Sequence, residues 1–266
     1  MTTTEDNSRP MLELRGIGFT YPGREKPVFS NLDFRLNREK IALLGDNGSG
    51  KTTLLQIMVG LLRPTQGEVY FQGRPMRKEK DFFPLRRRIG MLFQHADDQL
   101  FCPSVLEDVA FGPLNLGRSR EEARAISVET LNSIGLTGYE DRITHQLSGG
   151  EKRLVALATV LAMQPSALLM DEPTNDLDHD AKSRLLSVLS SLDMPFILIS
   201  HDWDFLARLC TGFYSLKHGH LHKSETIKVH QHSHAHALGE QGHHHLTQEH
   251  QQPDNARTAE GDGHGR

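Results

Sequence analysis

The chain has 266 residues, a formal net charge of −4 and two cysteines. Its length suits one large domain with at most a small subdomain. The slight excess of acidic residues gives no electrostatic reason to expect binding to nucleic acid or to an anionic membrane. Two cysteines cannot build a disulfide framework, and they favour a reducing cytosolic compartment. The sequence shows neither an apolar signal peptide nor an apolar run of about 18 residues, so the chain is not expected to cross a membrane itself.

Short apolar runs alternate along the chain with segments of helical periodicity, which predicts an α/β fold. Residues 11–21 and 68–73 alternate apolar and polar side chains, as antiparallel strands do. Residues 40–45, 166–172 and 195–202 contain continuous apolar runs, which are typical of buried parallel strands. The sequence therefore predicts a mixed sheet system.

A helical subdomain is expected to be inserted between these strands, at about residues 97–163. Ser104 and Glu107 have the spacing of a capping box ahead of apolar periodicity, and so do Ser119 and Glu122. In a capping box, the serine and the acidic side chain satisfy backbone N–H groups at the start of a helix. Two helix starts are therefore predicted at these serines.

The residues from Gly45 to Thr52 read GDNGSGKT, directly after an apolar strand and before the helical segment TLLQIMVGLL. This strand–loop–helix context is that of a P-loop, in which glycines let backbone N–H groups turn towards a bound β-phosphate. Lys51 is expected to reach the β- and γ-phosphates, and Thr52 to offer its hydroxyl to Mg²⁺. The loop predicts nucleotide binding, but alone it does not separate ATP from GTP.

Two acidic residues end another apolar strand, in the run ALLMDE at residues 167–172. Asp171 is placed to hold Mg²⁺ opposite Thr52, directly or through water. Glu172 is then the candidate base, because its carboxylate can take a proton from the water that attacks the γ-phosphate. An acidic pair at a strand end is often only a solvated turn, so this interpretation depends on the P-loop.

Two further polar residues end apolar runs and are expected at the same edge of the sheet. His201 follows the run FILIS, and its imidazole can contact the γ-phosphate and help to position the attacking water. Gln94 ends the run GMLFQ, and its amide can sense the metal ion and that water. A lone histidine is more often structural, and the glutamine alone has almost no specificity.

The segment LSGGEKRLVALA, residues 147–158, predicts a capped helix that also presents an anion site. Ser148 and Glu151 have capping-box spacing. Gly149 and Gly150 leave the backbone N–H groups of the first turn clear of side chains, which favours anion binding at the helix N-terminus. A capped helix start alone is the simpler alternative. The chain thus offers two phosphate sites but only one nucleotide motif.

These motifs, in this order, resemble those of the ATP-binding cassette (ABC) ATPases. The resemblance implies a P-loop NTPase fold with a mixed sheet core, an antiparallel β subdomain and an inserted helical subdomain. It also implies a head-to-tail dimer in which the signature LSGGE of one subunit closes on the ATP of the other. Such a dimer accounts for two phosphate sites in a chain with one nucleotide motif.

The same resemblance assigns roles residue by residue. Glu172 corresponds to the catalytic base, His201 to the switch histidine and Gln94 to the Gln loop, while residues 176–178 correspond to the D-loop. Tyr21 corresponds to the aromatic residue that stacks on adenine. Thr52, Gln94 and Asp171 are the residues expected around Mg²⁺. The residues expected to contact ATP are Tyr21, Gly45, Asp46, Asn47, Gly48, Ser49, Gly50, Lys51, Thr52, Thr53, Gln94 and Asp171, with Ser148, Gly149, Gly150 and Glu151 acting from the other subunit.

A finer resemblance links FQHADDQLFCPSVLEDVAFGPLNLG and the segment from LSGGE to NDLD to the ATPase subunits of energy-coupling-factor (ECF) importers, particularly those for cobalt and nickel. It implies a transmembrane coupling protein and a substrate-binding membrane subunit as partners, and a peripheral location on the cytoplasmic face of the cell membrane. His95, Ala96, Asn175 and Asp176 depart from that subgroup, which bears on partner fit and turnover. Some importers of this kind pair two related ATPases, so a homodimer and a heterodimer are both open.

The composition changes at Lys223, after which histidine, glutamine, glycine, serine and acidic residues dominate. An ATP-binding domain at residues 1–222 and a disordered tail at residues 223–266 are therefore predicted. All but four of the 16 histidines lie at or beyond His218. Because neutral imidazole binds nickel, cobalt, copper and zinc, the tail is expected to bind such ions, although a solubilising, titrating tail is the alternative. The candidate ligands are His230, His232, His234, His236, His243, His244 and His245.

The sequence thus predicts an ATPase subunit that powers import of nickel or cobalt through membrane partners, with ATP and Mg²⁺ as cofactors and nickel or cobalt as candidate ions for the tail. No nucleic-acid partner is expected. One alternative is the ATPase of a vitamin-type ECF importer. Another is a non-transport ABC ATPase with an accessory metal-binding tail, although ABC ATPases that act on nucleic acid or ribosomes commonly join two cassettes in one chain.

Overall fold

The computed structural model describes residues 10–224, which form two sheets flanked by helices. One sheet is antiparallel and has the strand order β2-β1-β4-β5, and the other has the order β10-β9-β3-β8-β7-β6. The strands of the first sheet are β1 (Leu12–Phe19), β2 (Phe29–Leu36), β4 (Gln66–Phe71) and β5 (Arg74–Pro75). Those of the second are β3 (Lys40–Leu44), β6 (Ile89–Leu92), β7 (Ala167–Asp171), β8 (Phe196–Ile199), β9 (Gly212–Lys217) and β10 (His220–Lys223).

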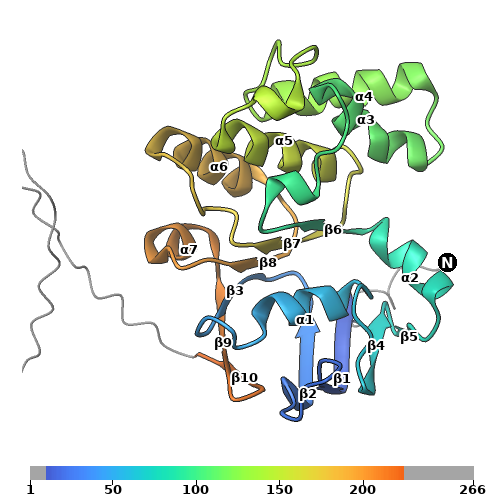
Figure 1. The fold of residues 1–266 in the computed structure, drawn as a ribbon, viewed down its shortest axis with the longest axis vertical. Coiled ribbons are helices and arrows are strands. Elements are labelled where there is room, and N and C mark those ends of the chain that lie inside the picture. The colour runs from blue at the N-terminus through green and yellow to red at the C-terminus, as the bar shows by residue number, and fades with distance from the viewer. Residues whose placement is uncertain (1–9, 225–266) are drawn as a thin grey trace, which may run out of the picture. The chain divides into compact units, whose positions relative to one another are not determined.

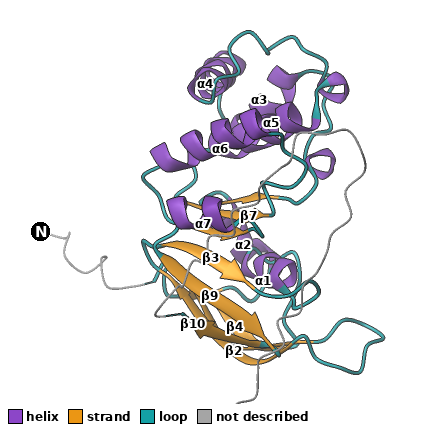
Figure 2. Cartoon of the chain, turned by 90° about the vertical axis from the view of Figure 1, so that its left-hand side faces the viewer, coloured by secondary structure: helices purple, strands orange, loops and turns teal. Residues whose placement is uncertain are grey.

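The helices pack on both sides of the six-stranded sheet. Helix α1 lies between the two sheets, whereas α3, α4, α5 and α6 gather on the opposite side of strands β6 to β8 (Figures 1 and 2). The helices are α1 (Lys51–Met58), α2 (Glu79–Arg86), α3 (Val105–Asn115), α4 (Arg120–Ser133), α5 (Gly149–Leu161), α6 (His179–Ser191) and α7 (Trp203–Leu209), with short 3₁₀ turns at Ala96–Asp98 and Thr144–Gln146.

The central strands of the six-stranded sheet are buried on both faces. In β7, Leu168 and Met170 belong to the core beneath α3, α5 and α6, while Ala167 and Leu169 belong to the core shared with α1 and the antiparallel sheet. Strands β6, β7, β8, β3 and β9 pair in parallel, and β10 pairs antiparallel to β9. The predicted mixed sheet, with buried parallel strands, is therefore confirmed.

The helix starts follow the predicted capping boxes. The Ser104 hydroxyl accepts from the backbone N–H of Glu107 at 3.3 Å, and the Ser119 hydroxyl accepts from that of Glu122 at 3.2 Å. Helices α3, α4 and α5 occupy the stretch predicted to be an inserted helical subdomain. Each pair satisfies backbone N–H groups that have no partner within the helix. Because these contacts lie within four consecutive residues, the sequence alone predicts where each helix begins.

Residues 10–224 include no helix that is long and apolar enough to span a membrane. Cys102 and Cys210 are free within this range, and burial raises the pKa of Cys210 to about 12. The histidines from His230 to His245 that were expected to bind metal lie outside the described residues, as does all of the predicted tail beyond Ser224.

The antiparallel sheet contains a buried acid held between two arginines. Glu13 on β1 is 5% exposed, and its carboxylate accepts from Arg15 at 2.6 Å and from Arg35 on β2 at 2.8 Å. Glu13 and Arg35 are direct cross-strand partners. The Arg15 hydrogen bond, with that of Arg35, outweighs burial and lowers the pKa of Glu13 below its ordinary value.

Glu13→Gln is expected to lower the free energy of unfolding at pH 7 by about 1–2 kcal/mol, since charged hydrogen bonds are lost but the arginines remain solvated. The contribution is fully present above the ordinary carboxyl pKa of 4.5 and is lost as the pH falls through the lowered folded pKa. Guanidinium unfolding of both proteins across that pH range measures the difference. A difference that stays constant down to pH 2 would contradict the assignment.

Candidate functional site

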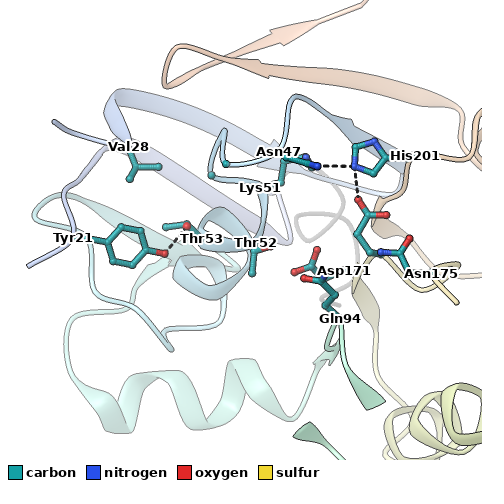
Figure 3. Close-up of a pocket in the computed structure, with 13 residues that line it drawn as sticks. Tyr21, Val28, Asn47, Lys51, Thr52, Thr53, Gln94, Asp171, Asn175 and His201 are labelled. Carbon is teal, nitrogen blue, oxygen red and sulfur yellow. Dashed lines mark hydrogen bonds and ion pairs between the residues drawn. The ribbon is translucent and has the colours of Figure 1, made fainter. Parts of the chain in front are cut away.

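A cavity of about 480 Å³ opens where β3, β7 and β8 end. Figure 3 shows its labelled side chains converging from both sides of the P-loop. Eleven of the fourteen residues expected around ATP within one subunit line this cavity, from positions as far apart as Tyr21 and His201, whereas Gly45, Asp46 and Ser49 do not. The lining residues are Tyr21, Val28, Asn47, Gly48, Gly50, Lys51, Thr52, Thr53, Gln94, Asp171, Glu172, Asn175 and His201.

The P-loop connects β3 to α1 and depends on glycine conformations. Gly50 precedes α1 at φ 102°, and a Cβ there would lie 2.5 Å from Val28. No other residue type accepts both the left-handed backbone and this close contact. Lys51 at the start of α1 is buried, and its ammonium donates to the carbonyls of Gly45 at 2.7 Å and Asp46 at 3.1 Å. The loop therefore holds its lysine over the cavity.

Asp171 and Glu172 lie at the end of β7, and both carboxylates are buried. Burial raises the pKa of Asp171, opposed first by a hydrogen bond from Thr52 and then by Lys51. Burial also raises the pKa of Glu172, opposed by the charges of His201 and Lys51. Lys51 thus lies close enough to act on both acids, and this fits a site that handles charged phosphate.

Glu172 has an unusual backbone and one unused carboxylate oxygen. Its φ is +48°, in the left-handed region that non-glycine residues avoid. Its Oε1 lies 3.1 Å from His201 Nε2, while its buried Oε2 has no hydrogen-bond partner among the described residues. Buried polar oxygens are nearly always satisfied, so this oxygen is an exception, and it belongs to a residue that lines the cavity.

His201 follows β8 and bridges the P-loop and β7. Its Nε2 lies 3.1 Å from the side-chain oxygen of Asn47 and 3.1 Å from the Glu172 carboxylate (Figure 3). A proton on this nitrogen can be donated to either oxygen. The imidazole is therefore placed between the phosphate loop and the acid.

Gln94 lines the cavity and is fixed through its backbone by a buried arginine. Arg153 on α5 donates to the carbonyl of Phe93 at 2.8 Å and to that of Gln94 at 2.5 Å. Desolvation lowers the pKa of Arg153, although the Asp176 and Asp171 charges oppose this effect. Neither Arg153 nor the cavity residue Val28 carried a motif signal, and sequence reasoning did not assign them to the site.

Tyr21 also reaches the cavity, from the end of the antiparallel sheet. Its hydroxyl shares a 2.7 Å hydrogen bond with Thr53, and its ring meets Phe19 edge to face. The ring of Tyr21 thus gives the cavity an aromatic surface beside α1. Asn175, which the sequence marked only as a D-loop departure, lines the opposite side.

Oxygen ligands suitable for Mg²⁺ lie together in the cavity. Thr52 and Gln94 offer a hydroxyl and an amide, and the buried carboxylate of Asp171 lies beside the Thr52 hydroxyl. Mg²⁺ prefers such hard oxygen donors and keeps several waters and phosphate oxygens as further ligands. The residues present therefore fit a Mg²⁺ ion brought in with a nucleotide.

The signature segment forms the start of α5 and does not line this cavity. Ser148 accepts from the N–H of Glu151 at 3.3 Å, which confirms the predicted capping box. Glu151 accepts from the N–H of Ser148 at 2.8 Å, from the Tyr139 hydroxyl at 2.6 Å and from Arg142 at 3.0 Å. The hydrogen bond from Tyr139 is the main cause of its lowered pKa.

The two glycines of the signature differ in their surroundings. A Cβ on Gly149 would meet nothing within 4 Å, whereas a Cβ on Gly150 would lie 2.8 Å from Ala181 Cβ on α6. Gly150 is therefore a packing residue between α5 and α6. Only Gly149 faces open space.

The comparisons with known proteins agree with this geometry. The ABC transporter family matches residues 29–175, which is more than half of the chain. The chain belongs to the ABC transporter ATPase family. It is thus an ATP-hydrolysing cassette with the ABC fold, and its relatives include ECF transporter ATPases.

Individual relatives match over most of their length. A protein of Nitratidesulfovibrio vulgaris, provisionally described as an ABC transporter ATP-binding protein, is 53% identical over 91% of this chain and 89% of its own. The ECF transporter ATP-binding protein EcfA of Methanocaldococcus jannaschii is 40% identical over 82% of this chain and 80% of its own.

Solved structures are similar in fold. The structure of cbiO1 from Clostridium perfringens, part of the ABC transporter complex cbiONQ, has a TM-score of 0.71 at 33% identity, covering 80% of this chain and 87% of that one. The cassette MJ0796, in a dimeric post-hydrolysis state with ADP and Pi, has a TM-score of 0.72 at 28% identity, covering 82% and 100%.

Gly150→Ala is expected to lower the free energy of unfolding by about 1–3 kcal/mol, because the added methyl overpacks the contact with Ala181 on α6. Gly149→Ala is the matched control, and it should leave stability unchanged or raise it by up to about 1 kcal/mol, since alanine favours the helix. Urea unfolding of both variants measures the contrast. Equal effects of the two substitutions would refute the packing role of Gly150.

Proposed function

We propose that this chain is the ATP-hydrolysing subunit of an importer of a transition-metal ion, nickel or cobalt, acting through membrane partners. The observation that supports its motor role most directly is the cavity that joins the P-loop to Asp171, Glu172 and His201. The proposed cargo rests on the resemblance to ECF importers for cobalt and nickel and on the ECF transporter ATPases among the relatives.

In the proposed mechanism, the P-loop N–H groups and Lys51 bind the β- and γ-phosphates of ATP. Lys51 exchanges its hydrogen bonds to the P-loop carbonyls for phosphate oxygens. Thr52 and Asp171 would hold Mg²⁺, which would supply positive charge to the phosphates. Tyr21 stacks on adenine. Gln94, whose carbonyl accepts from Arg153, lines the cavity and would supply its amide to the metal ion and the attacking water.

Glu172 is the proposed base. It takes a proton from water as the water oxygen forms a bond to the γ-phosphorus and the bond to the β–γ bridging oxygen breaks, leaving ADP and phosphate. Burial raises its pKa towards the working pH, which suits proton acceptance. His201, already 3.1 Å from the same carboxylate, orients Glu172 and contacts the γ-phosphate.

The signature residues are proposed to act on the ATP of a second subunit. Ser148, Gly149, Gly150 and Glu151 do not line the cavity of their own chain, which supports a role at another subunit. The start of α5 leaves Gly149 open, and a helix N-terminus attracts phosphate. The dimeric cassette among the solved structures supports this arrangement, with either a second copy or a related ATPase as partner.

A second cavity, of about 260 Å³, is proposed to receive the transmembrane coupling protein. Its lining is mainly apolar and includes the exposed rings of Phe101 and Phe111, which meet edge to face at 4.8 Å. The buried Asp108 accepts from the N–H groups of Phe101 and Cys102 and so fixes this loop. Exposed aromatic grooves of this kind suit an amphipathic helix.

We further propose residues 1–222 as the ATP-binding domain and residues 223–266 as an accessory tail whose histidines bind nickel or cobalt. With a membrane-embedded coupling protein in the second cavity, the chain is peripheral on the cytoplasmic face of the membrane. The ion is the cargo of the membrane partners, and the tail contributes a store or receiver of that ion.

Glu172→Gln is expected to keep ATP affinity, slow hydrolysis by at least about a hundredfold and accumulate an ATP-bound dimer, because the amide cannot accept the proton. Lys51→Ala is the contrasting variant, and it should weaken ATP binding instead. Single-turnover hydrolysis, nucleotide titration and light scattering measure the three quantities. Normal hydrolysis in Glu172→Gln would remove the base, and unchanged affinity in Lys51→Ala would remove the phosphate contact.

ATP-dependent uptake of radiolabelled Ni²⁺ and Co²⁺ into vesicles that contain the assembled complex tests the cargo. Accumulation of either ion is expected with the wild-type chain and is lost with Glu172→Gln. Hydrolysis by the complex without uptake of either ion would overturn the metal cargo. Uptake of a vitamin by the same vesicles would then identify the vitamin-type importer.

A further inference from the structure

The hairpin of β9 and β10 carries two histidines that the nucleotide site does not use. Its register pairs His220 with Lys217, Leu221 with Leu216 and His222 with Ser215. His218 and Gly219 form the turn with φ of 48° and 78°, as a two-residue hairpin turn of the mirror-image type requires. The turn and register together fix where each side chain of β10 points.

The face of the strand follows from its alternation. Leu221 is partly buried and packs against the core shared by the two sheets. Neighbouring residues on a strand point to opposite faces, so His220 and His222 share the face turned away from that core, and both are exposed. In the described part of the chain β10 is the last strand in the order of its sheet, and β2 of the antiparallel sheet lies against it.

We propose that His220 and His222 form a two-imidazole site for a divalent transition-metal ion such as Ni²⁺. Residues two apart on a strand are about 7 Å apart along it, and two imidazoles can swing inward from that spacing to ligate one ion at about 2.1 Å. Nickel, copper and zinc favour neutral imidazole, whereas Mg²⁺ favours oxygen. The site is therefore chemically separate from the ATP cavity.

The surroundings predict a weak, exchangeable site. Residues 10–224 contain no group of three or more histidine, cysteine, aspartate or glutamate side chains suited to a metal ion, so this part of the chain supplies two ligands at most. Lys217, opposite His220, places a positive charge beside the ion, and Ser215, opposite His222, offers a hydroxyl. Lys217→Gln should accordingly tighten the site by about two- to fivefold.

The hairpin also packs against the P-loop and against Val28 of the nucleotide site. An ion bound to the hairpin is therefore linked to that site through these backbone contacts. A Cβ on Gly45 of the P-loop would lie 2.7 Å from the carbonyl oxygen of Leu216 on β9. A Cβ on Gly219 in the turn would lie 2.8 Å from the carbonyl of Val28, which lines the ATP cavity. An ion that joins two residues of β10 stiffens the strand that this turn leads into.

Residue-by-residue modification of histidines by diethyl pyrocarbonate, read by mass spectrometry on the full chain, tests the proposal at buffered free Ni²⁺ concentrations. His220 and His222 are expected to lose reactivity several-fold with one shared midpoint. His179, which is 94% exposed at the start of α6, should keep its reactivity. Full reactivity of both β10 histidines at saturating Ni²⁺ would overturn the site.

Three variants decide whether the pair acts as a unit. His222→Ala should raise the midpoint for His220 at least about tenfold, because even indirect partners of metal ligands contribute about 10- to 100-fold to affinity. His218→Asn should change nothing, because Asn-Gly suits the same mirror-image turn. Replacing every histidine from His230 onward by glutamine should leave the midpoint unchanged at the same free Ni²⁺. Undiminished protection of His220 in His222→Ala, or loss of protection in the tail variant, would overturn the assignment, and neither result bears on the proposed cargo.

Discussion

The burial of the six-stranded sheet on both faces is the constraint on which the functional site depends. Strands β3, β7 and β8 have apolar cores on either side, so their interiors admit almost no polar residue. Polar side chains avoid the free-energy cost of burial only where these strands end. Since parallel strands end at a common edge, the P-loop, Asp171 with Glu172, and His201 are brought to one place, although more than 150 residues separate Asn47 from His201.

A second constraint is the set of hydrogen bonds between helix α5, which begins with the signature, and the segment that follows β6. The helix that begins with the signature also carries Arg153, whose guanidinium holds the carbonyl oxygens of Phe93 and Gln94. The amide of Gln99 bonds to Ala156 and Thr159 on the same helix. The segment after β6 is thus attached to α5 at several points. A displacement of this segment by a partner is therefore shared with the helix that presents the signature.

The buried strands and the helix starts were predictable from the sequence because they depend on patterns of neighbouring residues. The apolar runs predicted the buried strands, and the serine–glutamate spacings predicted the starts of α3, α4 and α5, since each depends on neighbouring residues alone. Gly150 shows where local reasoning ends. Its packing against Ala181 is a contact between helices, and nothing in the LSGGE motif distinguishes it from the open Gly149. Val28 and Arg153 reach the site through tertiary packing in the same way.

The left-handed backbone of Glu172 lowers the stability of the fold at the residue whose carboxylate contacts His201. An L-residue at φ 48° costs roughly 1–2 kcal/mol, and this cost is offset by the pairing of β7 with β8, including the bond from the Glu172 N–H to the Ile199 carbonyl. Glycine or asparagine would relax the backbone, but neither brings a carboxylate to His201. If Glu172 is the base proposed above, position 172 is a stability–activity trade-off, and selection for a more stable protein alone would remove the acid.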